Sequence, residues 1–334
     1  AITPNGSGKV QLDGLAWPTA DGSANQVLKT DGSGALSWVS ESGASNVTGL
    51  SDGLVENNSI FIGNDPSSTT NAASYNTSLG VTALTAITTG DDNTALGYDA
   101  LGALTSGASN TALGSNTLKQ TTSGNFNVAV GYAALKANTT GVRNIAIGLG
   151  ALDAPDTEND NLAIGYDALG GSIAGGEGNI AIGNYSLDAN TSGDNNTSTG
   201  YDALTGNTTG ADNTALGYDA GDVITTGSQN VIIGSGSDPS ANSASNQIVI
   251  GYGVTGQADN SVVLGNANVT AVYMAQDKGA TAYGATFEAS TGIIPDAADG
   301  AYLGTASAEF SDLFLADGSV INLGNDQDVT LTHV

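Results

Sequence analysis

The chain has 334 residues, and its 33 acidic and 6 basic residues give a formal net charge of −27, which speaks against nucleic acid and anionic membranes as partners. Its 48 glycines and few large apolar residues argue against one large globular core and favour a repetitive fold that needs little core per residue. The absence of cysteine excludes thiolate metal sites, and a single histidine, His333, argues against a Ser-His-Asp triad.

Residues 1–50 are predicted to form a β-rich neck or connector. Asp-Gly and Gly-Ser pairs separate short alternating segments such as Val10–Leu12 and Leu36–Trp38. In style this segment resembles the neck regions of phage tail fibres. The resemblance implies a fibre protein, and we expect the sequence to be a part of a longer chain.

A repeat dominates residues 51–270. One phrase returns as NTALGYDAL from Asn93, NVAVGYAAL from Asn127 and NLAIGYDAL from Asn161. Its glycines follow one another at steps of 17 residues, with one step of 18 between Gly165 and Gly183. We take the Asn and Gly of each copy as structural repeat residues; they are Asn93 and Gly97, Asn110 and Gly114, Asn127 and Gly131, Asn144 and Gly148, Asn161 and Gly165, Asn179 and Gly183, Asn196 and Gly200, Asn213 and Gly217, and Asn230 and Gly234.

Each repeat unit is predicted to be one coil of a β-solenoid with two short strands and two turns. Apolar residues two apart, such as Val128 and Val130, indicate strand alternation and are expected to face the core. Ala129 between them is expected on the opposite face, where its small size allows another backbone to come close. The leucine four residues after the glycine, such as Leu135, would form the second wall of the core.

This core is thin, and thinner still where threonines replace the apolar pair, as at Thr197 and Thr199. We therefore expect several chains to pack side by side, with the alanine face as a surface suited to close contact. Stacked Asn residues are expected to bond to one another along the solenoid.

The motif N-x-A-[IVL]-G-x-x-[AS]-L resembles the head repeat of trimeric autotransporter adhesins of the YadA type. The resemblance extends from about Asn58 to Gly265. It implies an all-β fold, a left-handed parallel β-roll of about 17-residue coils, and a homotrimer. Such repeats also occur in phage fibres, which makes the two resemblances compatible.

Residues 271–334 are predicted to form a C-terminal β-rich fibre element that continues beyond the sequence. Apolar runs such as Phe310 with Leu313–Leu315, followed by Val320–Ile321, are typical of short strands.

Tyrosines that follow the repeat glycine predict a surface-contact ladder. They are Tyr98, Tyr132, Tyr166, Tyr201 and Tyr218. Rings on neighbouring coils, such as Tyr201 and Tyr218, could stack and bind a glycan or a protein, or instead cover a seam between chains. Asp202 and Asp219 would lie one coil apart, which makes them weak candidates for Ca²⁺ or another cation; a solvated acidic stripe is the alternative. No catalytic residue and no cofactor is predicted.

The sequence predicts a structural and adhesive trimeric fibre rather than an enzyme. A virion fibre, of a phage tail or capsid, that projects from the particle and contacts a host surface is the first hypothesis. A bacterial surface adhesin or filament subunit is the alternative, and a glycan depolymerase is a distant third, because carboxylates are plentiful. Expected partners are further copies of the chain, other virion or appendage proteins, and a host glycan or protein. No apolar run is long enough to insert into a membrane.

Overall fold

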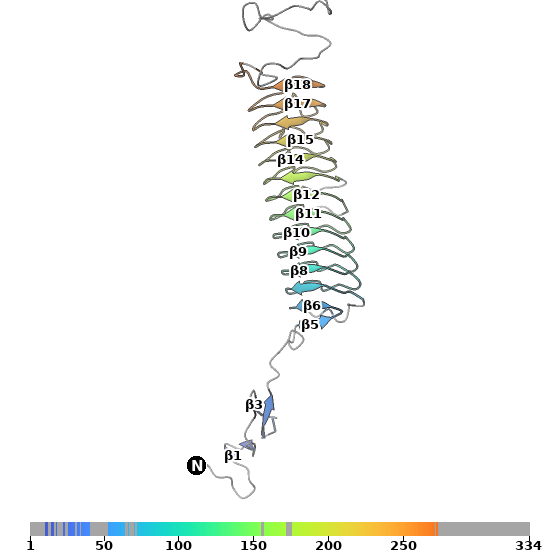
Figure 1. The fold of residues 1–334 in the computed structure, drawn as a ribbon, viewed down its shortest axis with the longest axis vertical. Coiled ribbons are helices and arrows are strands. Elements are labelled where there is room, and N and C mark those ends of the chain that lie inside the picture. Colours follow the sequence, from blue (N-terminus) through green and yellow to red (C-terminus); the bar gives the residue numbers. More distant parts are fainter. Residues whose placement is uncertain are drawn as a thin grey trace, which may run out of the picture. The chain divides into compact units, whose positions relative to one another are not determined.

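The computed structural model describes a long central stretch, residues 53–63, 72–154, 157–171 and 176–270. It also describes scattered residues outside this stretch: 11–12, 15–16, 18, 23, 26–30, 32–33, 35–40, 66, 70 and 272. Every regular element among these residues is a β-strand (Figure 1). The predicted all-β class is therefore confirmed for the described chain. The predicted C-terminal element lies outside the described residues, apart from Val272.

Residues 11–40 contain two short antiparallel pairs. Strand β1 (Gln11–Leu12) pairs with β2 (Leu15–Ala16), and β3 (Gln26–Thr30) pairs with β4 (Leu36–Ser40). The strand predicted at Leu36–Trp38 is confirmed, and of the one predicted at Val10–Leu12 the described part, Gln11–Leu12, is a strand.

The central stretch forms one sheet of 14 strands whose order in space follows the order in sequence. It starts with an antiparallel hairpin of β5 (Gly53–Glu56) and β6 (Ser59–Ile62), and from β6 on each strand pairs in parallel with the next. The parallel strands are β7 (Thr77–Leu79), β8 (Thr94–Leu96), β9 (Thr111–Leu113), β10 (Val128–Val130), β11 (Ile145–Ile147), β12 (Leu162–Ile164), β13 (Ile180–Ile182), β14 (Thr197–Thr199), β15 (Thr214–Leu216), β16 (Val231–Ile233), β17 (Gln247–Ile250) and β18 (Ser261–Leu264).

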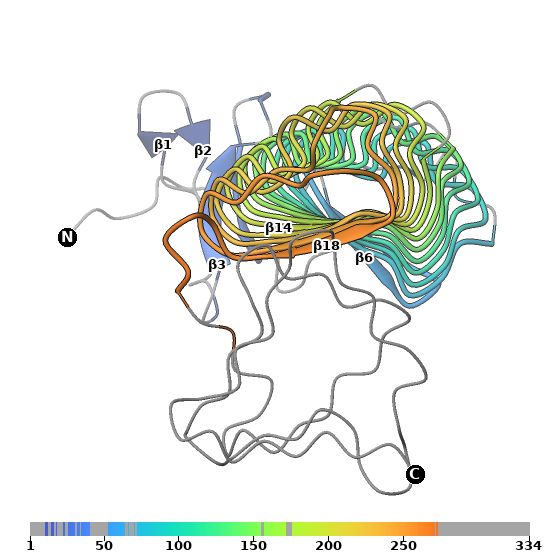
Figure 2. The ribbon, with the colours of Figure 1, turned by 90° about the horizontal axis from the view of Figure 1, so that it is seen from above.

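This stretch is the predicted β-solenoid, and we call it the roll. Equivalent residues of successive coils lie side by side, as Ala129 pairs with Ala112 and Ala146. Seen from above in Figure 2, the strands form one long side of a flattened coil. Most coils hold one three-residue strand, so the prediction of two strands per coil is wrong. The opposite side turns because residues such as Asp99 and Leu101 have left-handed φ angles of 57° and 52°, which an extended strand does not permit.

The interior of the roll is lined by alanine on the strand side and leucine on the opposite side. Ala129 and Ala146 are fully buried, and so are Leu135 and Leu152. By contrast, Ile145 and Ile147 are 38% and 39% exposed and point outward. The prediction that the apolar pairs face the core is therefore wrong, and so is the prediction that the alanines form an outer face for contact between chains. Strand alternation places the two sets on opposite faces. The central inward position is alanine on most strands, and it is Ile232 on β16 and Val249 on β17, both buried.

A column of fully buried asparagines joins the coils. The Asn213 side-chain nitrogen donates to Asn196 Oδ1 at 3.1 Å and to the Gly227 carbonyl at 2.8 Å. Asn213 Oδ1 in turn accepts from the backbone and side-chain nitrogens of Asn230, at 3.1 Å and 3.0 Å. The predicted bonding between stacked asparagines is confirmed, and it satisfies polar groups that no water reaches.

Candidate functional site

The most extended candidate site is the outward strand face, which we define as the two columns of residues that flank the central inward residue of strands β6 to β18. Neither column contains a charged side chain, although the chain carries a net charge of −27. The first column is Ile60, Thr77, Thr94, Thr111, Val128, Ile145, Leu162, Ile180, Thr197, Thr214, Val231, Ile248 and Val262. The second is Ile62, Leu79, Leu96, Leu113, Val130, Ile147, Ile164, Ile182, Thr199, Leu216, Ile233, Ile250 and Leu264.

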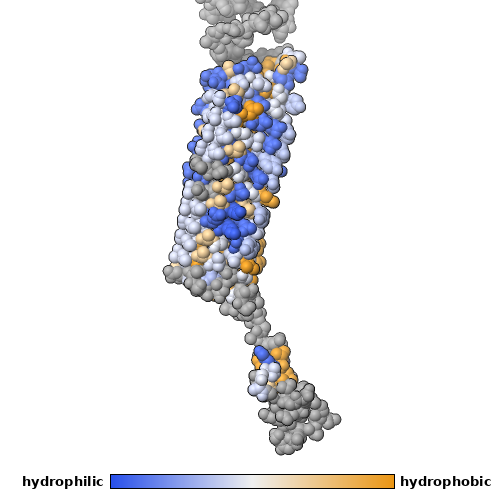
Figure 3. Space-filling model, turned by 180° about the vertical axis from the view of Figure 1, so that it is seen from behind, coloured by the Kyte–Doolittle hydropathy of each residue, from blue (hydrophilic) through white to orange (hydrophobic). Residues whose placement is uncertain are grey.

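The outward strand face leaves large apolar side chains open to solvent. Leu79 and Leu216 are each 49% exposed, and Val262 is 58% exposed. The opposite side of the roll is different: Figure 3 shows mainly hydrophilic atoms there, with small and separate hydrophobic patches. A strip of this length that carries no charge and exposes Val, Ile or Leu on nearly every strand marks an interaction site.

Four tyrosines form a continuous row of rings on consecutive coils. Ring centroids are 5.2 Å apart between Tyr166 and Tyr185, 5.9 Å between Tyr185 and Tyr201, and 5.6 Å between Tyr201 and Tyr218. The last pair is stacked at an interplanar angle of 10°, which confirms the stacking predicted for Tyr201 and Tyr218.

The row differs from the predicted ladder at its N-terminal end and in its middle. Tyr98 and Tyr132 are exposed, but in the described chain they make no ring contact, because Ser115 and Leu149 occupy the equivalent places on the coils that follow them. Tyr185 was missed, because it stands two residues after Gly183, at the place where other copies carry aspartate. The row runs beside the outward strand face, since each tyrosine comes one or two residues after the glycine that follows a strand.

Aspartates form an acidic column along the same side of the coils: Asp153, Asp167, Asp188, Asp202, Asp219, Asp222 and Asp238. Burial raises the pKa of Asp202, and the neighbouring carboxylates of Asp219 and Asp222 raise it further. The predicted proximity of Asp202 and Asp219 is thus confirmed. In the described ranges no cluster of three or more acidic, histidine or cysteine side chains is placed to hold a metal ion. The cation hypothesis for Asp202 and Asp219 stays a prediction.

This column makes the stability of the roll sensitive to pH. Burial raises the pKa of Asp238 from 3.8 to about 6, and Asp222 and Asp219 add to that shift. Burial also raises the pKa of Asp153 and Asp188, with nearby aspartates reinforcing it. These carboxyl groups therefore bind a proton more tightly in the folded roll than in the unfolded chain.

We expect the free energy of unfolding to rise as the pH falls from 8 to 5. The destabilisation from Asp238 is complete above its folded pKa of about 6 and is relieved as the pH falls through that value. Asp238→Asn should be more stable than the wild type at pH 8 and should show a flatter pH profile. Urea unfolding at constant ionic strength tests this. Lower stability at pH 5 than at pH 8 would contradict it.

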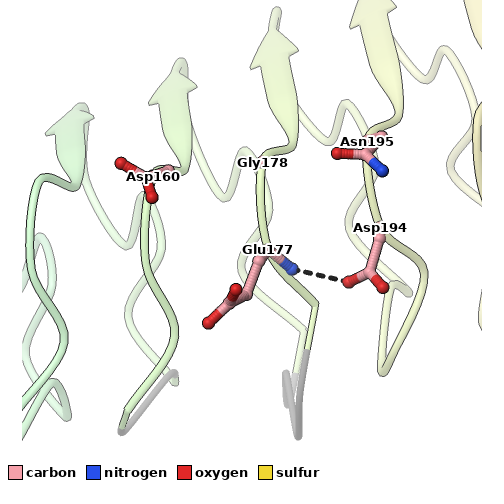
Figure 4. Close-up of a pocket in the computed structure, with 5 residues that line it drawn as sticks. All are labelled: Asp160, Glu177, Gly178, Asp194 and Asn195. Carbon is pink, nitrogen blue, oxygen red and sulfur yellow. Dashed lines mark hydrogen bonds between the residues drawn. The ribbon is translucent and has the colours of Figure 1, made fainter.

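A pocket of about 350 Å³ lies on another part of the roll, lined by Asp160, Glu177, Gly178, Asp194 and Asn195 (Figure 4). The Glu177 backbone N–H donates to Asp194 Oδ1 at 2.8 Å. Asp160 accepts from Arg143 Nη2 at 2.7 Å, and this hydrogen bond lowers the pKa of Asp160. A glycosidase needs an acid with a raised pKa to protonate its leaving group. The pKa of Asp160 is shifted in the opposite direction, so Asp160 is unsuited to that role.

Comparison of the chain with protein-family models, curated proteins and solved structures found no match. The described residues contain no helix that is long and apolar enough to cross a membrane.

Proposed function

We propose that the chain is a subunit of a homotrimeric, extracellular fibre with a structural and adhesive role. The observation that carries this proposal is the uncharged outward strand face, which runs along the whole roll. Each copy buries this face against the others, while the charged sides stay in water. The fibre belongs to a virion, of a phage tail or capsid, and projects from it toward a host surface.

A second copy of the chain is the partner that fits this face best. Parallel strands repeat about every 4.8 Å, so the face is a strip on the order of 60 Å long with one rung per coil. A partner must supply apolar side chains at the same spacing over the same length. Another copy of the chain meets this requirement because it has the same coils. Two molecules of net charge −27 also repel each other least where neither carries a charge.

The number three and the left-handed winding follow from the resemblance of the repeat to YadA-type head repeats. Cyclic symmetry lets three copies bury equivalent faces around one axis without leaving an open end for further growth. The tyrosine row at the border of the face is the candidate for contact with a host glycan or protein. A bacterial surface adhesin with the same roll is the alternative, and a coiled-coil stalk and membrane anchor further along the same protein would favour it.

Charges placed on the outward strand face should dissociate the assembly. We expect the wild type to sediment as a trimer and Ile147→Glu/Leu216→Glu to sediment as a monomer. A buried, unpaired carboxylate costs several kcal/mol, which corresponds to at least about a 100-fold weaker association for each of the two. Analytical ultracentrifugation and native mass spectrometry give the mass, and circular dichroism checks the fold.

The matched control carries the same new charges on another side of the roll. Ser123 and Ser192 are exposed, and each lies between a threonine and a glycine in the segment of the coil that precedes the next strand. Ser123→Glu/Ser192→Glu should keep the trimer. A wild type that stays monomeric at micromolar concentration, or equal effects of the two double variants, would refute the proposal.

A further inference from the structure

One rung of the outward strand face differs from all the others. Strand β14 presents Thr197 and Thr199 outward, whereas every other strand from β6 to β18 presents at least one Val, Ile or Leu. The rung is also polar inside, where Ser198 replaces the usual alanine. The Ser198 hydroxyl donates to the Ala203 carbonyl at 2.7 Å and accepts from Ser186 Oγ at 2.7 Å.

The outward hydroxyls of this rung have no hydrogen-bond partner within the described chain. Ser198 is satisfied inside the roll, and Thr191, which lies outside the strands, donates to the Thr208 carbonyl of the next coil. Thr197 and Thr199 are partly exposed and reach only solvent in a single copy. If the outward strand face is covered, these hydroxyls need partners from the molecule that covers it, because a buried hydroxyl without a partner is costly.

We propose that Thr197 and Thr199 are the residues that fix the register between copies in the fibre. The hydroxyls of β14 in neighbouring copies hydrogen-bond to one another and hold the copies level. This inference rests on the proposed function, because it needs copies that meet through the outward strand face. It goes beyond that function by assigning the alignment of the copies to one rung.

A roll of nearly identical coils needs such a device. Sliding one copy by one coil brings each rung opposite a rung of similar shape, so packing alone specifies the register weakly. With β14 present, a slide by one coil sets Thr197 and Thr199 against Ile180 and Ile182 of β13 and leaves hydroxyls buried without partners. One polar layer in an apolar seam fixes the register of coiled coils in the same way, at some loss of affinity.

The threonines of β7, β8 and β9 are less able to do this. Thr77, Thr94 and Thr111 occupy the first column of three successive rungs, and each has a leucine beside it in the second column. A slide by one coil within this block still sets threonine against threonine and leucine against leucine. Only β14 has hydroxyls in both columns, so only β14 marks one unique level.

The experiment reads the register by photo-cross-linking in the full chain. The sequence has no cysteine, so Tyr218→Cys gives a single attachment point for a benzophenone maleimide, directly beyond the strip. Mass spectrometry then locates the intermolecular adducts to a coil. The wild-type background is compared with Thr197→Ile/Thr199→Ile, and with a relocated variant that also carries Ile180→Thr/Ile182→Thr. Native mass spectrometry gives the oligomeric state of each.

We expect adducts centred on one coil in the wild-type background. In Thr197→Ile/Thr199→Ile the oligomer should persist and resist dissociation better, but adducts should spread in steps of a whole coil. Since an unpaired hydroxyl disfavours a shifted register by about tenfold, the share of adducts outside the main coil should rise at least about threefold. The relocated variant should return to a single register, because it again has one rung with hydroxyls in both columns.

Three results would overturn the inference, and they are distinguishable. If the wild type is an oligomer and Thr197→Ile/Thr199→Ile keeps its single register, the alignment comes from elsewhere, and the proposed function stands. If the wild type is monomeric, the proposed function fails and this inference fails with it. Spread adducts in the double variant that the relocated rung does not correct would also overturn it, because a unique polar rung is then not sufficient.

Discussion

Gly148→Ala is expected to destabilise the roll by at least about 3 kcal/mol, although it adds a single methyl group. Gly148 has a φ angle of 143°, which L-residues rarely adopt. A Cβ atom at this position would lie 2.0 Å from the carbonyl oxygen of Gly165 on the next coil. That atom belongs to the backbone, so relief requires the two coils to separate, which breaks the strand pairing of β11 and β12.

The control for this substitution is Gly236→Ala. Gly236 also has a positive φ angle, 60°, but an added Cβ there would meet no atom within 4 Å. It should cost only the roughly 1 kcal/mol of a left-handed L-residue. Urea unfolding followed by circular dichroism compares the two. Because a solenoid is stabilised by contacts between neighbouring coils, Gly148→Ala should also split unfolding into two steps, one on each side of the defect. Equal losses in both variants would show that the clash is not the cause.

The period of the repeat is what made the fold predictable from sequence. A step of 17 residues between repeat glycines fits one coil of a stacked solenoid. The structure has this period, because Ala112, Ala129 and Ala146 stand 17 residues apart and pair on neighbouring strands. The side of the coil opposite the strands was not predictable in the same way. Leu101 and Leu135 adopt left-handed φ angles there, 52° and 51°, and leucine gives no local signal for that conformation.

The sequence pattern did not determine which face of each strand points outward and forms the candidate site. Alternation separates Ala146 from Ile145 and Ile147 but does not say which set is inside. The usual rule that larger apolar residues are buried gave the wrong answer. A signal was available: threonine replaces the apolar residue at Thr94, Thr111 and Thr214, which is tolerated on an outward face, whereas the central position is mostly alanine.

The sequence predicted only part of the acidic column and of the tyrosine row, because some of their residues occupy different repeat positions. Asp202 and Asp219 share one repeat position, so the sequence predicted their proximity. Asp238 stands at a different repeat position on the next coil, and only the fold brings it beside Asp219 and Asp222. Tyr185 likewise occupies a different repeat position from Tyr166 and Tyr201, and its ring reaches both.

Asn213→Ala is expected to cost about 3–5 kcal/mol, because one truncation leaves several buried groups without partners. Asn230 loses the acceptor of its backbone and side-chain nitrogens, and the Gly227 carbonyl loses a donor. Asn242→Ala is the control: Asn242 is exposed, and only its backbone carbonyl bonds to the previous coil. Its loss should stay within about 0.5 kcal/mol. Hydrogen exchange should show faster exchange of the Asn230 amide in Asn213→Ala alone. If both variants unfold at the same urea concentration, the asparagine column does not stabilise the roll, and the asparagine of each repeat must have another role.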